Sequence, residues 1–428
     1  MTDSSVEAES AIKRRKIEDD NNNNDDKVVQ HHQCQLFIKR KNRYCSMQRK
    51  ATEKYCSEHM IHDNDQEGKK KRVPCPLDPT HTVWEYNLKK HVKKCNTRPS
   101  EVHDEWYELD VNSQKKTSDK ESGGGTALDD KELYAKYIPI LRNYEIQDLE
   151  YRIEDHSGCW GRIGELKNQK HALQQLSLIG NLRDQGLLSS SKFYVEFGCG
   201  KAELSRYVNL CIEQDEKKQE HQEQYGYGLI DRGVNRMKMD KKILSESSKK
   251  PTVLRSLMDI KDFSLAKFQN VCKSQHIVGI SKHLCGAATD LTLNAVLQTQ
   301  MRGIDGILIA MCCRHVCLWD QLLPRSRDYL TEHGFPDEQA FYILKKMVSW
   351  AISGVGQAGD NTHVSGLTVS EREELGLKAR RLVDQSRVEA VIDTLTPLQN
   401  QYRTEMFWYT TRDITLENVA LLIKRIED

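Results

Sequence analysis

Short apolar runs recur along the last two thirds of the chain, separated by stretches with helical periodicity. The strand-like runs are Phe193–Phe197, Tyr227–Asp231, Thr252–Leu257, Ile277–Ser281, Gly306–Met311, Val388–Ile392 and Met406–Thr411. Several are largely continuous apolar runs rather than alternating ones, as expected of strands that are buried on both faces of a sheet. The alternation of strands and helices predicts a doubly wound, Rossmann-like α/β sheet over residues 127–428.

Polar stretches divide the rest of the chain. Residues 1–30 are too polar to bury a core, which predicts a disordered tail. Residues 99–126 are polar and contain Ser122-Gly123-Gly124-Gly125, which predicts a flexible linker. Between these segments lie two short stretches rich in cysteine and histidine, residues 31–62 and 72–98.

Two further polar stretches interrupt the α/β pattern. Glu213–Gln224 is almost wholly charged or amide-bearing and is expected to extend a helix into solvent. Ser353–Ser370 is rich in Gly, Thr and Ser and is expected to form a long surface loop.

Overall the charge is balanced, with 64 Lys and Arg against 63 Asp and Glu. Between His31 and Arg98, however, 16 Lys and Arg face 7 Asp and Glu, and such a basic surface favours phosphate backbones. No apolar run approaches the roughly 20 residues that cross a bilayer, and the N-terminus has no secretory signal. We therefore expect an intracellular protein without a membrane partner. Lys13-Arg14-Arg15-Lys16 is either a nuclear import signal or a solvated basic cluster, so nucleus and cytoplasm both stay open.

The two cysteine- and histidine-rich stretches have the spacing of metal ligands. The first quartet is Cys34, Cys45, Cys56 and His59, and the second is Cys75, His81, His91 and Cys95. Tetrahedral Zn²⁺ takes four such ligands and supplies folding energy that modules of about thirty residues cannot obtain from apolar burial. The spacing predicts two zinc ions, and His32 or His62 could replace a ligand in the first module. A large chain without a signal peptide also favours reduced thiols over disulfides.

A glycine turn follows the first predicted strand. In Glu196-x-Gly198-x-Gly200 the glycines allow a tight turn and a close approach of a ligand to the backbone. A dinucleotide fingerprint would have a third glycine where Glu203 stands, so NAD is disfavoured. The pattern resembles the first motif of class I S-adenosylmethionine methyltransferases, which implies that Asp231 accepts ribose hydroxyls and that Asp259 lies near the adenine.

Polar residues cluster after the next two strands, where open α/β sheets bind their ligands. Lys282 and His283 are candidates to deprotonate or orient a hydroxyl, and Arg314 and His315 are candidates to hold a phosphate. Alternatively, the two histidines brace the loops. A third metal site from Cys285, Cys312, Cys313 and Cys317 is less favoured, because adjacent residues on a strand point to opposite faces.

These motifs, taken in order, resemble the eukaryotic tRNA 2′-O-methyltransferases that modify residue 4 of the acceptor stem. The resemblance rests above all on Ser281-Lys-His-Leu-Cys-Gly286 followed by Cys312-Cys-Arg-His315. It implies methyl transfer from S-adenosylmethionine to a ribose 2′-hydroxyl of tRNA, with the CCCH and CHHC zinc modules assisting RNA binding. Two alternatives remain: a base methyltransferase with Cys285 or Cys312 as nucleophile, and a non-catalytic RNA-binding or splicing factor.

Overall fold

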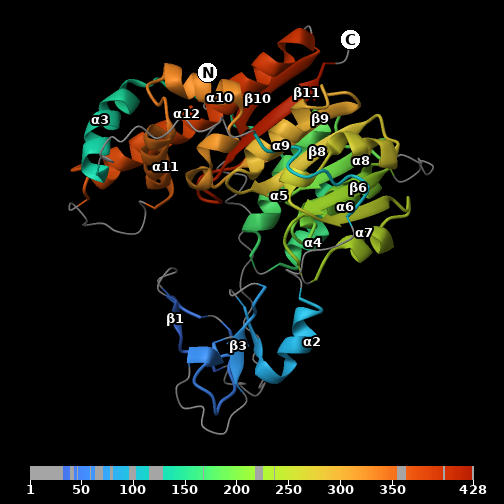
Figure 1. Cartoon of the computed structure of the whole chain (residues 1–428). Helices are drawn as coiled ribbons and strands as arrows, with labels where there is room; N and C mark the ends of the chain where they lie inside the picture. The colour runs from blue at the N-terminus through green and yellow to red at the C-terminus, as the bar shows by residue number, and fades with distance from the viewer. Residues whose placement is uncertain are drawn as a thin grey trace, which may run out of the picture. The chain divides into compact units, whose positions relative to one another are not determined.

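The chain forms two compact units, Met1–Pro99 and Ser100–Asp428 (Figure 1). The computed structural model describes residues 32–38, 43–45, 47–57, 59–62, 71–77, 81–95, 103–114, 129–166, 168–216, 225–235, 237–353, 363–398 and 401–426. The predicted tail over residues 1–30, with the basic cluster Lys13–Lys16, lies outside these ranges.

The larger unit is built on a seven-stranded mixed sheet. Its strands are β5 (Phe193–Phe197), β6 (Gly226–Asp231), β7 (Thr252–Leu257), β8 (Ile277–Leu284), β9 (Ile304–Met311), β10 (Tyr402–Trp408) and β11 (Val419–Arg425). In space they follow the order β10-β11-β9-β8-β5-β6-β7. The five strands from β5 to β9 are parallel, and β11 is antiparallel to both of its neighbours. The prediction of an α/β fold with a mostly parallel sheet is therefore confirmed.

Two of the strand assignments need correction. Val388–Ile392 is not a strand but part of a 27-residue helix that begins with a capping box at Thr368 and Glu371. The run is apolar because one side of that helix packs against the sheet, and the helix overrides the strand preference of its valines. The sequence analysis missed β11, which pairs with β9, and β10 begins four residues before the predicted Met406.

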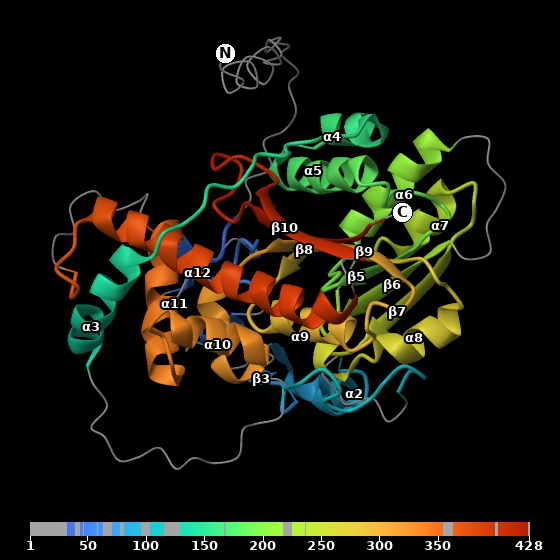
Figure 2. The ribbon, with the colours of Figure 1, turned by 90° about the horizontal axis from the view of Figure 1, so that it is seen from above.

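Ten α-helices of the described residues accompany the sheet. They are α3 (Asp130–Asn143), α4 (Trp160–Gly164), α5 (Lys170–Asp184), α6 (Glu203–Asp215), α7 (Asp240–Glu246), α8 (Leu265–Cys272), α9 (Ala288–Leu297), α10 (Pro324–Glu332), α11 (Glu338–Ser353) and α12 (Val369–Leu395). Figure 2 shows α5 and α6 on one face of the sheet and α8, α9 and α12 on the other. Of the predicted helical extension Glu213–Gln224, α6 includes the first three residues and ends with Glu216 as its C-cap, and residues 217–224 lie outside the described ranges, as do residues 354–362 of the predicted loop.

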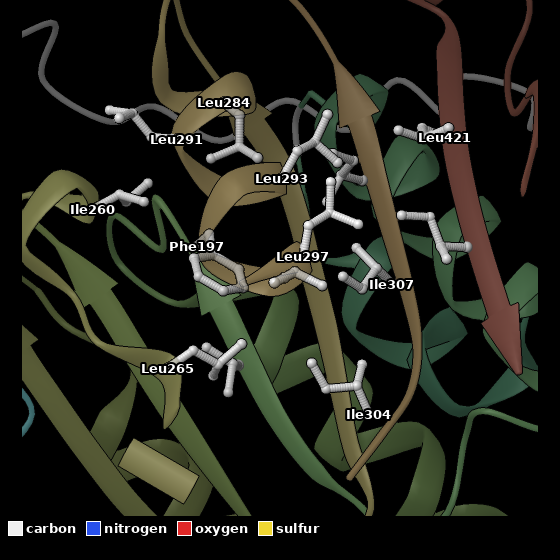
Figure 3. Packing of buried hydrophobic residues seen from close by; sticks show 14 of the residues in the cluster. Phe197, Ile260, Leu265, Leu284, Leu291, Leu293, Leu297, Ile304, Ile307 and Leu421 are labelled. Atoms are coloured by element: carbon white, nitrogen blue, oxygen red, sulfur yellow. The ribbon is translucent and has the colours of Figure 1, made fainter. Parts of the chain in front are cut away.

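Successive residues of the central strand β5 serve different cores. Phe193, Val195 and Phe197 pack with α8, α9 and α12, while Tyr194 packs with α5 and α6. Figure 3 shows Phe197 in the first of these cores with leucines of α9. This double burial explains why β5 is apolar at nearly every position.

A third core lies among helices rather than on the sheet. It joins α3, α10, α11 and α12, with Tyr137, Phe335 and Leu344 all close to fully buried. α12 contributes to this core and also to a sheet core, so it connects the helical layer with the sheet.

Buried ion pairs make the same connection. Arg387 of α12 forms two hydrogen bonds of 2.8 Å with Asp290 of α9, and both side chains have no exposed surface. Asp384 of α12 binds Arg314 at 2.6 and 2.7 Å, and Glu417 binds both Arg314 and Arg380. Three cations and three carboxylates therefore neutralise one another in a site with little water.

Part of the predicted linker instead packs within the larger unit. Within residues 99–126, the structure describes 103–114, and there Trp106 donates a 2.7 Å hydrogen bond to Ser256 and packs edge-on against Phe268. The buried Asn112 side chain donates to two backbone carbonyl oxygens. The prediction of a flexible linker is therefore wrong for 103–114, because one tryptophan and one asparagine anchor an otherwise polar segment.

The smaller unit consists of two short hairpins and short helices. Its elements are β1 (Phe37–Ile38), β2 (Arg43–Tyr44), η2 (Met60–His62), β3 (Arg72–Pro74), β4 (Thr82–Trp84), η3 (Glu85–Asn87) and α2 (Leu88–Val92). Among its described residues, the buried side chains are five cysteines and Arg72. This described part has no conventional apolar core, as is typical of modules whose folding energy comes from a bound metal.

No helix within the described ranges combines the length and apolarity needed to span a bilayer.

The Arg387–Asp290 pair yields a stability prediction. Asp290→Ala leaves the buried Arg387 guanidinium without the carboxylate to which it is hydrogen-bonded, so we expect the free energy of unfolding to fall by about 3–5 kcal/mol. The control is Glu373→Ala, which removes the partner of Arg412 from a solvent-accessible pair and should cost at most about 1 kcal/mol. Urea denaturation followed by circular dichroism measures both; equal losses would contradict the assignment.

Candidate functional site

The glycine turn lies between β5 and α6, at the carboxyl end of the sheet. Gly198, Gly200 and Ala202 all have positive φ, so the backbone turns sharply over a few residues. A Cβ placed on Gly198 would lie 3.0 Å from the backbone oxygen of His283. The turn therefore packs directly against the end of β8, and glycine is needed at this contact.

Glu196, near the end of β5, is hydrogen-bonded to the helix that follows the turn. Its carboxylate accepts hydrogen bonds from the backbone and hydroxyl of Ser205, in the first turns of α6, and it is almost fully buried. Burial raises the pKa of Glu196 to about 7, against the opposing effect of the Ser205 hydrogen bonds. The structure thus gives Glu196 a positioning task, and its predicted contact with a cofactor stays a proposal.

Asp231, at the end of β6, links two backbone turns. It accepts hydrogen bonds of 2.7 Å from the amide of Gly200 and 2.6 Å from the amide of Gly233. Asp259 caps the short helix η5 (Ile260–Asp262) and lies 3.3 Å from Arg232. Both predicted acidic residues therefore stand at neighbouring strand ends, partly open to solvent.

A cavity of about 270 Å³ opens at the ends of β6 and β7. Its lining residues are Asp231, Gly233, Lys238, Asp240, Arg255, Ser256 and Leu257. Arg255 forms a bidentate pair with Asp240 and also donates to the carbonyl oxygen of Gly200. The sequence analysis did not identify Arg255, because a single arginine in a strand carries no recognisable motif.

Lys282 lies on β8 in a cluster of three basic side chains. Its Nζ is 2.9 Å from Nδ1 of His171 on α5 and 3.4 Å from Nε2 of His283. Burial lowers the pKa of Lys282 to about 8, against the opposing attraction of Glu203 at the start of α6. The cluster can therefore exchange a proton near neutral pH.

The two histidines favour their neutral forms. The charge of Lys282 and partial burial lower the pKa of His171. The pKa of His283 is lowered mainly by desolvation of its ring and next by the charge of Lys282, although the side chain still reaches solvent. A neutral imidazole nitrogen can accept a hydrogen bond from the Lys282 ammonium. His171 was missed from sequence because it lies over one hundred residues before β8, in a helix without a motif.

Arg314 does not hold a phosphate as predicted. The side chain has no exposed surface, and its guanidinium is occupied by Asp384 and Glu417, so its role is to fix the turn after β9. His315, the next residue, is partly exposed, and its buried Nδ1 makes no hydrogen bond with any described residue. A substrate contact by His315 remains a proposal.

Within each N-terminal quartet, the four predicted ligands lie close together. In each quartet, one ligand atom per residue lies within 4.8 Å of the other three. In the second, Cys75 Sγ is 3.6 Å from Cys95 Sγ and 3.2 Å from His91 Nε2. In the first, His59 Nδ1 lies 3.6 Å from Cys34 Sγ and 3.4 Å from Cys56 Sγ. Such cysteine and histidine donor sets suit tetrahedral Zn²⁺.

Family models match most of the larger unit and both N-terminal quartets. The family model described as Methyltransferase TRM13 matches residues 173–424. The chain belongs to the TRM13 methyltransferase family. Two zinc-finger models match as well: the CCCH zinc finger in TRM13 protein over residues 32–60 and the U11-48K-like CHHC zinc finger over residues 72–96. Each of these two ranges contains one complete quartet.

Curated relatives with the name tRNA:m(4)X modification enzyme TRM13 cover most of the chain. The protein of Debaryomyces hansenii is 50% identical over 92% of this chain and 92% of its own. That of Scheffersomyces stipitis is 49% identical over 90% of this chain and 98% of its own. A protein of Schizosaccharomyces pombe is 35% identical over 83% of this chain and 96% of its own. The family resemblance inferred from the motifs is thereby confirmed.

The zinc modules of this TRM13 family member can be tested separately. We expect Cys75→Ser to remove one zinc equivalent and to unfold the CHHC module, because the metal replaces the missing core. Native mass spectrometry counts the zinc, and NMR spectra report the module's structure. The control is Cys272→Ser, a partly buried thiol of α8, which should leave the zinc count unchanged. A folded CHHC module in the Cys75 variant would contradict the zinc assignment.

Proposed function

We propose that this chain methylates a ribose 2′-hydroxyl of tRNA, at residue 4 of the acceptor stem, with S-adenosylmethionine as methyl donor. The family and the printed name of its relatives support a tRNA substrate. The sheet order, with an antiparallel β11 beside β9, supports a Rossmann-like class I methyltransferase fold.

The observation that carries this proposal is the contact between Gly198 and the backbone of His283. It joins the turn proposed for the cofactor to the strand end that holds Lys282. A methyl donor and an acceptor hydroxyl must meet in line, so the two halves of such a site have to adjoin. In-line transfer needs positioning and proton removal rather than a covalent intermediate.

For the cofactor, the proposed residues are Glu196, Gly198, Gly200, Asp231 and Asp259. The glycines permit close approach, and the carboxylate of Asp231 retains lone pairs for ribose hydroxyls beside its two backbone hydrogen bonds. Asp259 stands one strand further, where an adenine would extend. When bound, S-adenosylmethionine supplies an electrophilic methyl group.

For the hydroxyl, the proposed base is Lys282 in its neutral form. As the bond from the 2′-oxygen to the methyl forms and the carbon–sulfur bond breaks, Lys282 Nζ takes the hydroxyl proton. His171 and His283 hold the amine in place by hydrogen bonds. A-form RNA exposes its 2′-hydroxyls on a shallow minor groove, so a stem nucleotide can reach this base without flipping out of the helix.

We propose that the zinc modules bind the RNA backbone. Lys89, Lys90 and Lys94 are exposed on and just after α2, beside the CHHC ligands. Phosphate contacts of this kind fix the register of an RNA without reading its bases.

The decisive experiment is mass spectrometry of tRNA that has been treated with the protein and isotope-labelled S-adenosylmethionine, then digested with ribonuclease. We expect one labelled methyl on the ribose of residue 4. A labelled base would favour the cysteine-dependent alternative, and no label despite cofactor binding would favour a non-catalytic RNA-binding protein.

A first prediction concerns the cofactor. Asp231→Ala removes a charged acceptor, so S-adenosylmethionine affinity should fall roughly 10- to 100-fold, as expected for a hydrogen bond to a charged group. Isothermal titration calorimetry measures the affinity, and circular dichroism checks the fold. The control is Asp184→Ala at the end of α5, which should bind normally; an unchanged affinity in the Asp231 variant would remove that residue from the site.

A second prediction concerns pH. Because only neutral Lys282 can accept a proton, the methyl-transfer rate should rise with pH and level off above its pKa of about 8. Lys282→Arg stays protonated throughout this range and should lose at least roughly 100-fold in rate, with tRNA and cofactor affinities retained. Single-turnover kinetics at saturating tRNA test both points. A variant with the wild-type rate, or a wild-type rate that falls as pH rises toward 8, would exclude this base.

A further inference from the structure

Three cysteines converge where β8 and β9 end. Cys285 follows β8 directly, and Cys312 and Cys313 follow β9. Their sulfur atoms all lie within 4.8 Å of one another, with Cys285 Sγ 3.3 Å from Cys313 Sγ and 3.8 Å from Cys312 Sγ. This group belongs to neither zinc module and has no task in the methyl transfer proposed above.

The sulfur–sulfur distances are longer than in a disulfide and suit a shared metal. A disulfide requires sulfur atoms about 2.05 Å apart. Sulfurs that bind one tetrahedral Zn²⁺ at about 2.3 Å stand roughly 3.8 Å from each other. The CHHC module of this chain shows a comparable separation, 3.6 Å between the sulfurs of Cys75 and Cys95.

The backbone explains how two adjacent cysteines can face one point. On a regular strand, Cys312 and Cys313 would point to opposite faces. β9, however, ends at Met311, and Cys313 has a left-handed conformation with φ of 47°. The sequence analysis disfavoured this site because it assumed that the strand continued through both residues.

A short sulfur–sulfur distance does not by itself define a metal site. Cys159 and Cys211 also lie 3.5 Å apart, yet both are fully buried and belong to a sheet core. Cys317, which the sequence analysis grouped with the other three, instead contacts the Arg387 guanidinium at 2.9 Å. What distinguishes the cluster is a third sulfur together with an exposed member, Cys285, through which an ion can enter.

We propose that Cys285, Cys312 and Cys313 bind a zinc ion, with the fourth position open to a water molecule. Three thiolates are a donor set that selects Zn²⁺ over harder cations. Among the described residues, the group contains no histidine as a fourth ligand. The ion would tie the loop after β8 to the turn after β9, two residues from His283, and the full chain would then hold one zinc more than its two N-terminal modules.

The test is a zinc count on the full chain, prepared with zinc and a thiol reductant. Native mass spectrometry should find one ion fewer in Cys285→Ser than in the wild-type protein. The exposed position makes this variant tolerable for the fold, and Cys272→Ser serves as the matched thiol control with an unchanged count. Because the readout is a difference, it holds whether or not the N-terminal modules are fully loaded, and it does not depend on methyl transfer.

Alkylation provides a second, independent measurement. An exposed free thiol reacts readily with an alkylating reagent, whereas a thiolate bound to zinc does not. Cys285 should therefore be protected in the zinc-loaded protein and become reactive after a chelator is added. Equal zinc counts in the wild-type and Cys285→Ser proteins, or immediate alkylation of Cys285 in the loaded protein, would overturn the proposal. So would protection that a reductant removes and a chelator does not, because that result identifies a disulfide.

Discussion

The arrangement of the strand ends depends on a buried set of ion pairs. Arg314, Arg380 and Arg387 are matched by Asp290, Asp384 and Glu417, and all except Glu417 are almost completely withdrawn from water. Such charges are costly to bury, so each must keep its partner, and this requirement fixes where the partners' backbones lie. The network holds the turn after β9, the start of α9 after β8 and the segment before β11 against α12. The ion pairs thereby fix these three segments relative to one another, beside the proposed site.

Backbone geometry shapes the proposed cofactor half of the site, and burial of a lysine shapes the proposed catalytic half. On the β5 side, the backbone determines the geometry, through positive φ values at Gly198 and Gly200 and through Asp231, which binds amides rather than side chains. On the β8 side, burial determines the chemistry, because removal of Lys282 from water makes its ammonium form less favourable. Ser281 joins the two sides by donating a 2.6 Å hydrogen bond to the carbonyl oxygen of Phe197.

The sequence was informative wherever local pattern decides structure. Apolar runs located β5 to β9, and ligand spacing located both metal quartets. Prediction from the sequence failed where contacts between distant parts of the chain determine the structure. The valines around Val388 form a helix because of what α12 packs against, and Arg314 is paired with carboxylates 70 and 103 residues later. His171 joins Lys282 only after folding, and the turn at Cys313 depends on backbone torsions that composition does not reveal.

The placement of β11 has a consequence for the order of folding. This strand, at residues 419–425, lies between β9 and β10 rather than at the edge of the sheet. During synthesis, β9 and β10 both leave the ribosome before the strand that separates them, so β9 keeps an unpaired edge until residue 425 has emerged. The nascent domain must therefore avoid pairing β9 with β10, or with another chain, for as long as β11 is missing.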